Sequence, residues 1–133
     1  MSDLCERLQD MGEAGVYRLS CPIEVLRGNA ALAELHSFEI DLANVHSKGE
    51  FLAAIAHAIQ APDWFGHNFD ALADALCDLS WLDEFDEGYV LLLLNSGDTL
   101  GLTAADHAIV TEIFNDTVSC WKQAGKPFWI FLA

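Results

Sequence analysis

Two short, wholly apolar runs constrain the fold of this chain more than any other feature of its sequence. Residues 89–94 read YVLLLL, and residues 128–132 read FWIFL. Gly88 precedes the first run and an Asn-Ser-Gly turn sequence follows it. Apolar runs of this length are typical of strands covered on both faces, which occur mainly in parallel sheets. Both segments are therefore predicted to be buried strands.

Helical patterns separate these strands from one another and from a third strand. Residues 37–42, SFEIDL, alternate apolar and polar side chains and predict a short strand. Ser47 followed by Glu50 predicts a helix start of the capping-box kind, in which the glutamate reaches back to the serine amide. Asn68 and Thr103 are predicted N-caps of two further helices. The order strand, helix, helix, strand, helix, strand favours an α/β fold with a parallel sheet and right-handed crossovers.

The first part of the chain is less regular than the rest. Residues 16–27, VYRLSCPIEVLR, alternate apolar positions around a proline and predict an edge strand or a hairpin. Gly28 and Asn29 then indicate a turn. The length of 133 residues suggests one domain. We expect residues 1–35 to be an N-terminal extension, part of the same domain or loosely attached, and residues 36–133 to form the main unit.

The charge of the chain excludes several classes of partner. There are 21 acidic residues against 6 basic ones, which gives a formal net charge of −15. Such a charge repels nucleic acid and anionic membranes and attracts basic partners. From residue 49 to residue 121 there is no Lys or Arg, whereas a surface balanced only for solubility mixes the two signs. One face of the protein is therefore predicted to be strongly negative. The protein is also predicted not to bind nucleic acid or membranes directly.

The cysteines give no sign of a metal or redox motif. Cys5, Cys21, Cys77 and Cys120 are widely spaced and form no C-x-x-C pair, so zinc and thioredoxin-type chemistry have no support. No basic segment followed by an apolar stretch marks a signal peptide, which predicts a cytoplasmic protein with reduced thiols. The thiols on the predicted helices are expected to serve as small apolar side chains. No cofactor is expected.

An acidic stripe is the least ordinary feature of the second predicted helix. Asp70, Asp74 and Asp78 recur every four residues and stack three like charges on one side. Each such pair costs a helix about 0.2–0.5 kcal/mol. The helix dipole favours an acid at Asp70, and Asp78 suits a solvated face, but Asp74 lies in the middle of the helix. The stripe, beside an aromatic connector, indicates a surface for a cationic partner.

The segment 62–76, PDWFGHNFDALADAL, resembles the signature of the barstar family, which are small inhibitors of barnase-type ribonucleases. The family pattern is a proline, an aromatic pair, a glycine, an asparagine, then D-A-L-x-D and a leucine, and every fixed element is present in register. The likeness covers about residues 37–133. It implies a barstar-like α/β fold, in two or three layers, with a small parallel three-stranded sheet packed by helices. The extension would add an edge strand or hairpin.

The resemblance also implies a function without catalysis. In the family, the connector and the second helix plug a nuclease active site, and their acids take the place of RNA phosphates. Asp74 matches the central contact of the family, and Asp70 matches the acid one turn earlier. Trp64 matches the aromatic that lies against the catalytic histidine. The implied partner is a basic extracellular-type ribonuclease or a nuclease toxin domain, which suggests toxin immunity.

Some positions depart from the family pattern. Ala73 stands where a large aromatic is frequent, and His67 stands where some members have an acid. A further acid on the last helix falls at Cys120 or, one turn away, at Asp116, and we favour Asp116. The predicted partner-binding residues are Trp64, Gly66, His67, Asp70, Ala73, Asp74, Asp78 and Asp116.

Two other functions fit parts of the pattern. A barstar-fold module that binds a different basic protein is suggested by the extension and by Ala73. A metal-dependent enzyme is suggested by His67, Asp70 and Asp74, because histidine with carboxylates binds Zn or Fe. The same spacing also arises on an ordinary solvated helix face.

Overall fold

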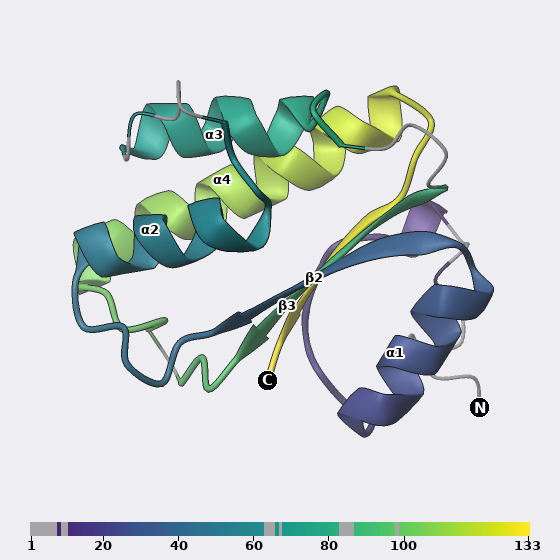
Figure 1. The fold of residues 1–133 in the computed structure, drawn as a ribbon, viewed down its shortest axis with the longest axis horizontal. Helices are drawn as coiled ribbons and strands as arrows, with labels where there is room; N and C mark the ends of the chain where they lie inside the picture. The colour runs from purple at the N-terminus through teal and green to yellow at the C-terminus, as the bar shows by residue number, and fades with distance from the viewer. Residues whose placement is uncertain (1–7, 9–10, 63–65, 67, 83–86, 98) are drawn as a thin grey trace.

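A parallel sheet of four strands lies at the centre of the protein, with helices on both of its faces (Figure 1). This is a computed structural model, and it describes residues 8, 11–62, 66, 68–82, 87–97 and 99–133. A 3₁₀ turn at Met11–Glu13 precedes the main elements. These elements are β1 (Val16–Arg18), α1 (Ile23–Leu32), β2 (Leu35–Asp41), α2 (Lys48–Ala58), α3 (Phe69–Asp78), β3 (Gly88–Leu94), α4 (Ala104–Gln123) and β4 (Phe128–Leu132).

The strands lie in the order β1-β4-β3-β2, and every neighbouring pair is parallel. The predicted order of strand, helix, helix, strand, helix, strand is confirmed by the succession from β2 to β4. The predicted strand at 37–42 begins two residues earlier, because Leu35 pairs with Gly88 in the β2–β3 ladder. Gly88 is fixed by packing, since a Cβ there would lie 2.6 Å from the carbonyl oxygen of Pro127.

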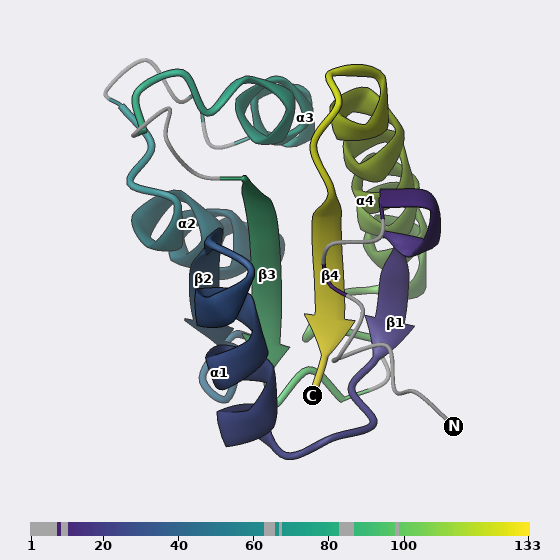
Figure 2. The ribbon, with the colours of Figure 1, turned by 90° about the vertical axis from the view of Figure 1, so that its right-hand side faces the viewer.

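The N-terminal extension adds an edge strand, as the sequence predicted, and not a hairpin. Val16 lies opposite Ile130, so β1 joins the sheet beside β4. Helix α1 then crosses the face of the sheet that α2, α3 and α4 do not cover, and Figure 2 shows it in front of the strands. The chain therefore forms three layers, with α1 on one side and three helices on the other.

The predicted turn at Gly28 and Asn29 is wrong, because both residues lie inside α1. The helix continues through them since Leu26 and Ala30 are buried against the sheet. Gly28 faces open space, with no atom within 4 Å of a Cβ at this position. Tertiary packing therefore overrides the local turn signal.

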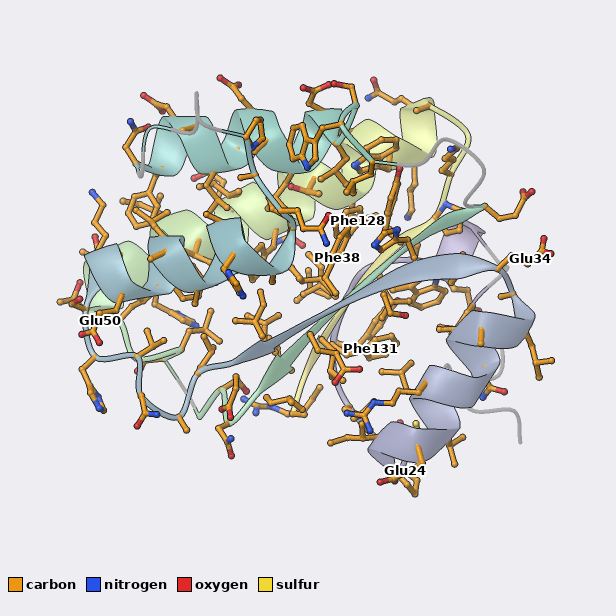
Figure 3. The ribbon with its side chains drawn as sticks, viewed as in Figure 1. Glu24, Glu34, Phe38, Glu50, Phe128 and Phe131 are labelled. Atoms are coloured by element: carbon orange, nitrogen blue, oxygen red, sulfur yellow. The ribbon has the colours of Figure 1, made fainter. Side chains whose placement is uncertain are left out.

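The core occupies both faces of the sheet. Figure 3 shows Phe38 and Phe128 on the side of α2, α3 and α4, and Phe131 on the side of α1. Both apolar runs are buried strands, as predicted. The indole of Trp129 donates a hydrogen bond of 2.8 Å to the Leu8 carbonyl oxygen, which ties the start of the chain to β4. Among the described residues, no helix is long and apolar enough to cross a membrane.

The three predicted helix caps are confirmed at Ser47, Asn68 and Thr103. The Ser47 hydroxyl accepts from the Glu50 amide at 3.2 Å, as a capping box requires. The Glu50 carboxylate contacts this same hydroxyl at 3.2 Å, whereas the sequence predicted that it would reach the serine amide. One hydroxyl thus serves as acceptor and donor at the start of α2.

Candidate partner-binding surface

Helix α3 lies on the outer side of the three-helix layer, packed on α4 and α2 (Figure 1). Its buried stripe consists of Leu72, Ala75 and Leu76, which have no exposed surface. These positions recur at three- and four-residue spacing, so they share one face of the helix. The opposite side of α3 therefore faces solvent.

The start of α3 is fixed by a local hydrogen-bonded turn. The Asn68 side chain accepts from the Ala71 amide at 2.8 Å, which satisfies one of the free donors of the first turn. Its amide group donates to the Gly66 carbonyl oxygen at 3.2 Å. A Cβ at Gly66 would lie 2.9 Å from this group, so a glycine gives the connector the room to turn into the helix.

The end of α3 is held by two side chains of α4. The Trp121 indole on α4 donates to the Leu76 carbonyl oxygen at 2.7 Å. The Cys120 thiol donates a longer hydrogen bond, 4.0 Å, to the Cys77 carbonyl oxygen. Both carbonyls belong to the last turn of α3, where the helix itself offers no donor. These contacts fix the direction in which the outer face of α3 points.

The outer face of α3 carries the predicted acidic stripe. Asp70, Asp74 and Asp78 are all exposed, and Asp116 on α4 is exposed as well. In the part of the chain that the structure describes, none of these carboxylates forms a hydrogen bond or an ion pair. Their mutual repulsion is therefore not relieved by an internal cation. We call these four residues the acidic surface.

The acidic surface extends across the junction of α3 and α4. Burial, the neighbouring Cys120 side chain and the charges of Asp116 and Asp74 together raise the pKa of the Cys77 thiol to about 12. Asp74 and Asp116 therefore both lie close enough to the Cys77 thiol to act on it, although they belong to different helices. Cys120, the other candidate for this position, is half-buried.

The remaining predicted residues fall in three groups. Gly66 is exposed and supports the α3 cap, and Ala73 is half-buried on α3. Trp64 and His67 lie outside the described residues, and so does part of the metal site suggested by the sequence. Within the described part of the chain, no three His, Cys, Asp or Glu residues gather so that they could hold a metal.

Two features of the site were missed by sequence reasoning. The Lys48 ammonium lies 4.4 Å from the centroid of the Phe69 ring, so a cation sits beside the first residue of α3. The Cys120 thiol contacts the Cys77 backbone across the α3–α4 junction, and its side chain acts on the Cys77 thiol. Both contacts join residues far apart in the sequence, and only the packing of the helices brings them together.

The expectation of reduced cysteines holds for part of the chain. Cys77 and Cys120 are free thiols. Cys21, in the N-terminal extension, is bound in a disulfide. The expectation is therefore wrong for Cys21.

Comparison with known proteins agrees with the fold. The family model described as Barstar (barnase inhibitor) matches residues 35–133. The match begins at the start of β2 and includes every element through β4, while β1 and α1 lie outside it. No curated protein matches this chain closely enough to count as a relative. Since the match covers most of its length and the elements follow the expected order, the chain belongs to the barstar family.

Proposed function

We propose that this protein inhibits a barnase-type ribonuclease by covering the nuclease active site with the acidic surface. The observation that carries the proposal is the exposure of Asp70 and Asp74, unpaired among the described residues, in a chain of a family described as barnase inhibitors. An inhibitor of this kind needs no catalytic residue and no cofactor. It needs anionic groups held in fixed positions outside the protein.

The geometry of α3 suits an imitation of an RNA backbone. A ribonuclease binds phosphates with cationic side chains, and carboxylates offer the same guanidinium groups two parallel hydrogen bonds. Asp70, Asp74 and Asp78 repeat every four residues, about 6 Å along the helix axis. The α3 cap at Asn68 and the Trp121 contact at the other end hold the two ends of the helix that carries this exposed row. A preorganised row loses little conformational entropy on binding.

The net charge of −15 also supports this function, because electrostatic attraction to a basic partner acts before the two proteins touch. Long-range attraction between an acidic and a basic protein raises the rate of their encounter and weakens as salt is added. Inhibition should therefore fall with ionic strength, mainly through slower association.

The direct test measures RNA cleavage by a panel of small basic ribonucleases with increasing amounts of this protein. We expect inhibition at a one-to-one ratio for at least one member, and a large loss of inhibition in Asp74→Asn. Glu24→Gln is the matched control, because it removes the same charge from α1 on the other side of the sheet (Figure 3). The proposal fails if no ribonuclease is inhibited, or if both variants inhibit as well as the unchanged protein.

A second function keeps the surface and changes the partner. Helix α1 and strand β1 lie outside the family match, and Ala73 places a small side chain next to Asp74, so a different basic protein is a specific alternative. Capture of a basic protein without nuclease activity from the native cell, lost when Asp70 and Asp74 are changed to Lys, would favour this alternative. We also infer that the N-terminal extension belongs to the same domain, supported by the pairing of β1 with β4.

A further inference from the structure

Two free thiols lie at the junction of α3 and α4. Cys77 and Cys120 are 43 positions apart in the sequence, yet the Cys120 sulfur is 4.0 Å from the Cys77 carbonyl oxygen. The Cys120 side chain is also close enough to the Cys77 thiol to help raise its pKa. Both side chains are half-buried, so the helices cover part of each one and solvent still reaches the rest. They form a pair of adjacent thiols and not two isolated cysteines.

This thiol pair lies in the middle of the acidic surface. Cys77 follows Asp74 by one turn of α3, and Cys120 follows Asp116 by one turn of α4. The charges of both carboxylates act on the Cys77 thiol. A chemical change at the pair therefore occurs between two of the carboxylates that the proposed function assigns to the partner.

We propose that Cys77 and Cys120 close to a disulfide between α3 and α4 under peroxide, and that this cross-link weakens partner binding. The effect on binding rests on the proposed function, whereas formation of the cross-link does not. The Cys120 sulfur attacks one oxygen of hydrogen peroxide, the O–O bond breaks, and a sulfenic acid and one water result. The Cys77 sulfur then attacks the sulfenic sulfur, and the S–S bond forms as a second water leaves. The two sulfurs lose two electrons, the peroxide gains them, and both thiol protons end in water.

The surroundings of the pair decide which oxidant reaches it. Hydrogen peroxide is neutral, so the acidic surface does not repel it, whereas glutathione disulfide is an anion and is repelled. Burial and the nearby carboxylates keep Cys77 as a thiol, because they raise its pKa to about 12. A thiol of high pKa is also a poor leaving group, so the same neighbours slow the reduction of the disulfide once it has formed. The oxidised form should be slow to appear and slow to disappear.

The cross-link alters the spacing of the acidic surface. A disulfide holds its two sulfurs about 2.05 Å apart, closer than two sulfurs that are not bonded to each other can lie, so the bond draws the two helices together at this point. Asp74 and Asp116 lie one turn from the two sulfurs and move with them. Charge-assisted hydrogen bonds depend on position, so a displaced pair of carboxylates fits the partner less well.

The test treats the full chain with hydrogen peroxide and maps its peptides by mass spectrometry. Trypsin is unsuitable because no Lys or Arg separates the two cysteines, so a protease that cuts after Glu is used. We expect a cross-linked pair of peptides that loses two hydrogen atoms and separates again with dithiothreitol. Cys77→Ala and Cys120→Ala should each abolish it. An equal concentration of glutathione disulfide should give the cross-link at least tenfold more slowly.

A second measurement compares inhibition before and after oxidation, with a ribonuclease that the reduced protein inhibits. We expect the inhibition constant of the unchanged protein to rise at least tenfold and to recover with dithiothreitol, while that of Cys120→Ala does not respond to peroxide. Absence of the cross-linked peptide overturns the inference, as does a cross-linked protein of unaltered inhibition constant. If the reduced protein inhibits no ribonuclease, the proposed function fails and the effect on binding fails with it, while peptide mapping still decides whether the pair oxidises.

Discussion

Replacement of Asp74 by Asn should stabilise the folded protein while it weakens inhibition. Asp74 lies in the middle of α3 with Asp70 one turn before it and Asp78 one turn after it. Among the described residues it has no hydrogen-bond or ion-pair partner that the substitution would remove. Asn and Asp have similar helix propensity, so the main change in the folded state is the loss of charge.

The magnitude follows from two like-charge pairs. Each i,i+4 repulsion costs about 0.2–0.5 kcal/mol, so removal of the central charge should raise the free energy of unfolding by about 0.4–1 kcal/mol. For a domain of this size the corresponding rise in Tm is roughly 1–5 °C. Salt screens both repulsions, so the gain should shrink at roughly 0.5 M salt.

Urea unfolding followed by tryptophan fluorescence measures this change as a shift in midpoint at constant slope. Glu24→Gln is the control, because the same loss of charge in the first turn of α1 removes a favourable interaction with the helix dipole and should destabilise slightly. If Asp74→Asn lowers the free energy of unfolding, the carboxylate has a stabilising partner within the fold. The reasoning that Asp74 is kept for binding would then be refuted.

Three other changes test separate parts of the structure. Trp121→Phe removes the buried hydrogen bond to the Leu76 carbonyl and should cost about 1–3 kcal/mol in urea unfolding, with α3 the first segment to exchange its amide hydrogens. Gly88→Ala forces a Cβ against a backbone carbonyl and should lower stability by at least about 1 kcal/mol, which thermal unfolding would detect. A hydrogen bond from Arg27 lowers the pKa of Glu39 in the folded protein. The stability that this pair contributes is therefore present above the pKa that Glu39 has in the unfolded chain, and it is lost as the pH falls through the lower pKa of the folded protein. Arg27→Gln should therefore destabilise the protein at pH 7 and have little effect at pH 2, and an equal effect at both would contradict this assignment.

Local signals predicted much of the fold. Residues 89–94 and 128–132 were identifiable as strands because every side chain in them is apolar, whichever face it takes. Asn68 and Thr103 were identifiable as caps because each bonds to an amide three residues away. By contrast, α1 was missed at Gly28, where contacts with a sheet built from later residues outweigh the turn preference.

The candidate site was predictable only along a single helix. Asp70, Asp74 and Asp78 share a stripe by periodicity alone, and their exposure follows from the apolar residues between them. The choice between Asp116 and Cys120 depends on how α4 lies against α3, which no spacing in the sequence specifies. The role of all these residues in binding a partner remains a prediction.

The position of β1 has a consequence for how this chain folds. Strand β1 pairs with β4, which comes much later in the sequence, since Val16 lies opposite Ile130. Contacts between residues so far apart in the sequence are slow to form, so we expect β1 to join the sheet after β2, β3 and β4. A shortened protein that starts at β2 would leave one side of β4 without its neighbour, and an uncovered strand of FWIFL is a template for association between chains. We therefore expect β1 to cover the free edge of β4 late in folding and to prevent separate molecules from pairing there.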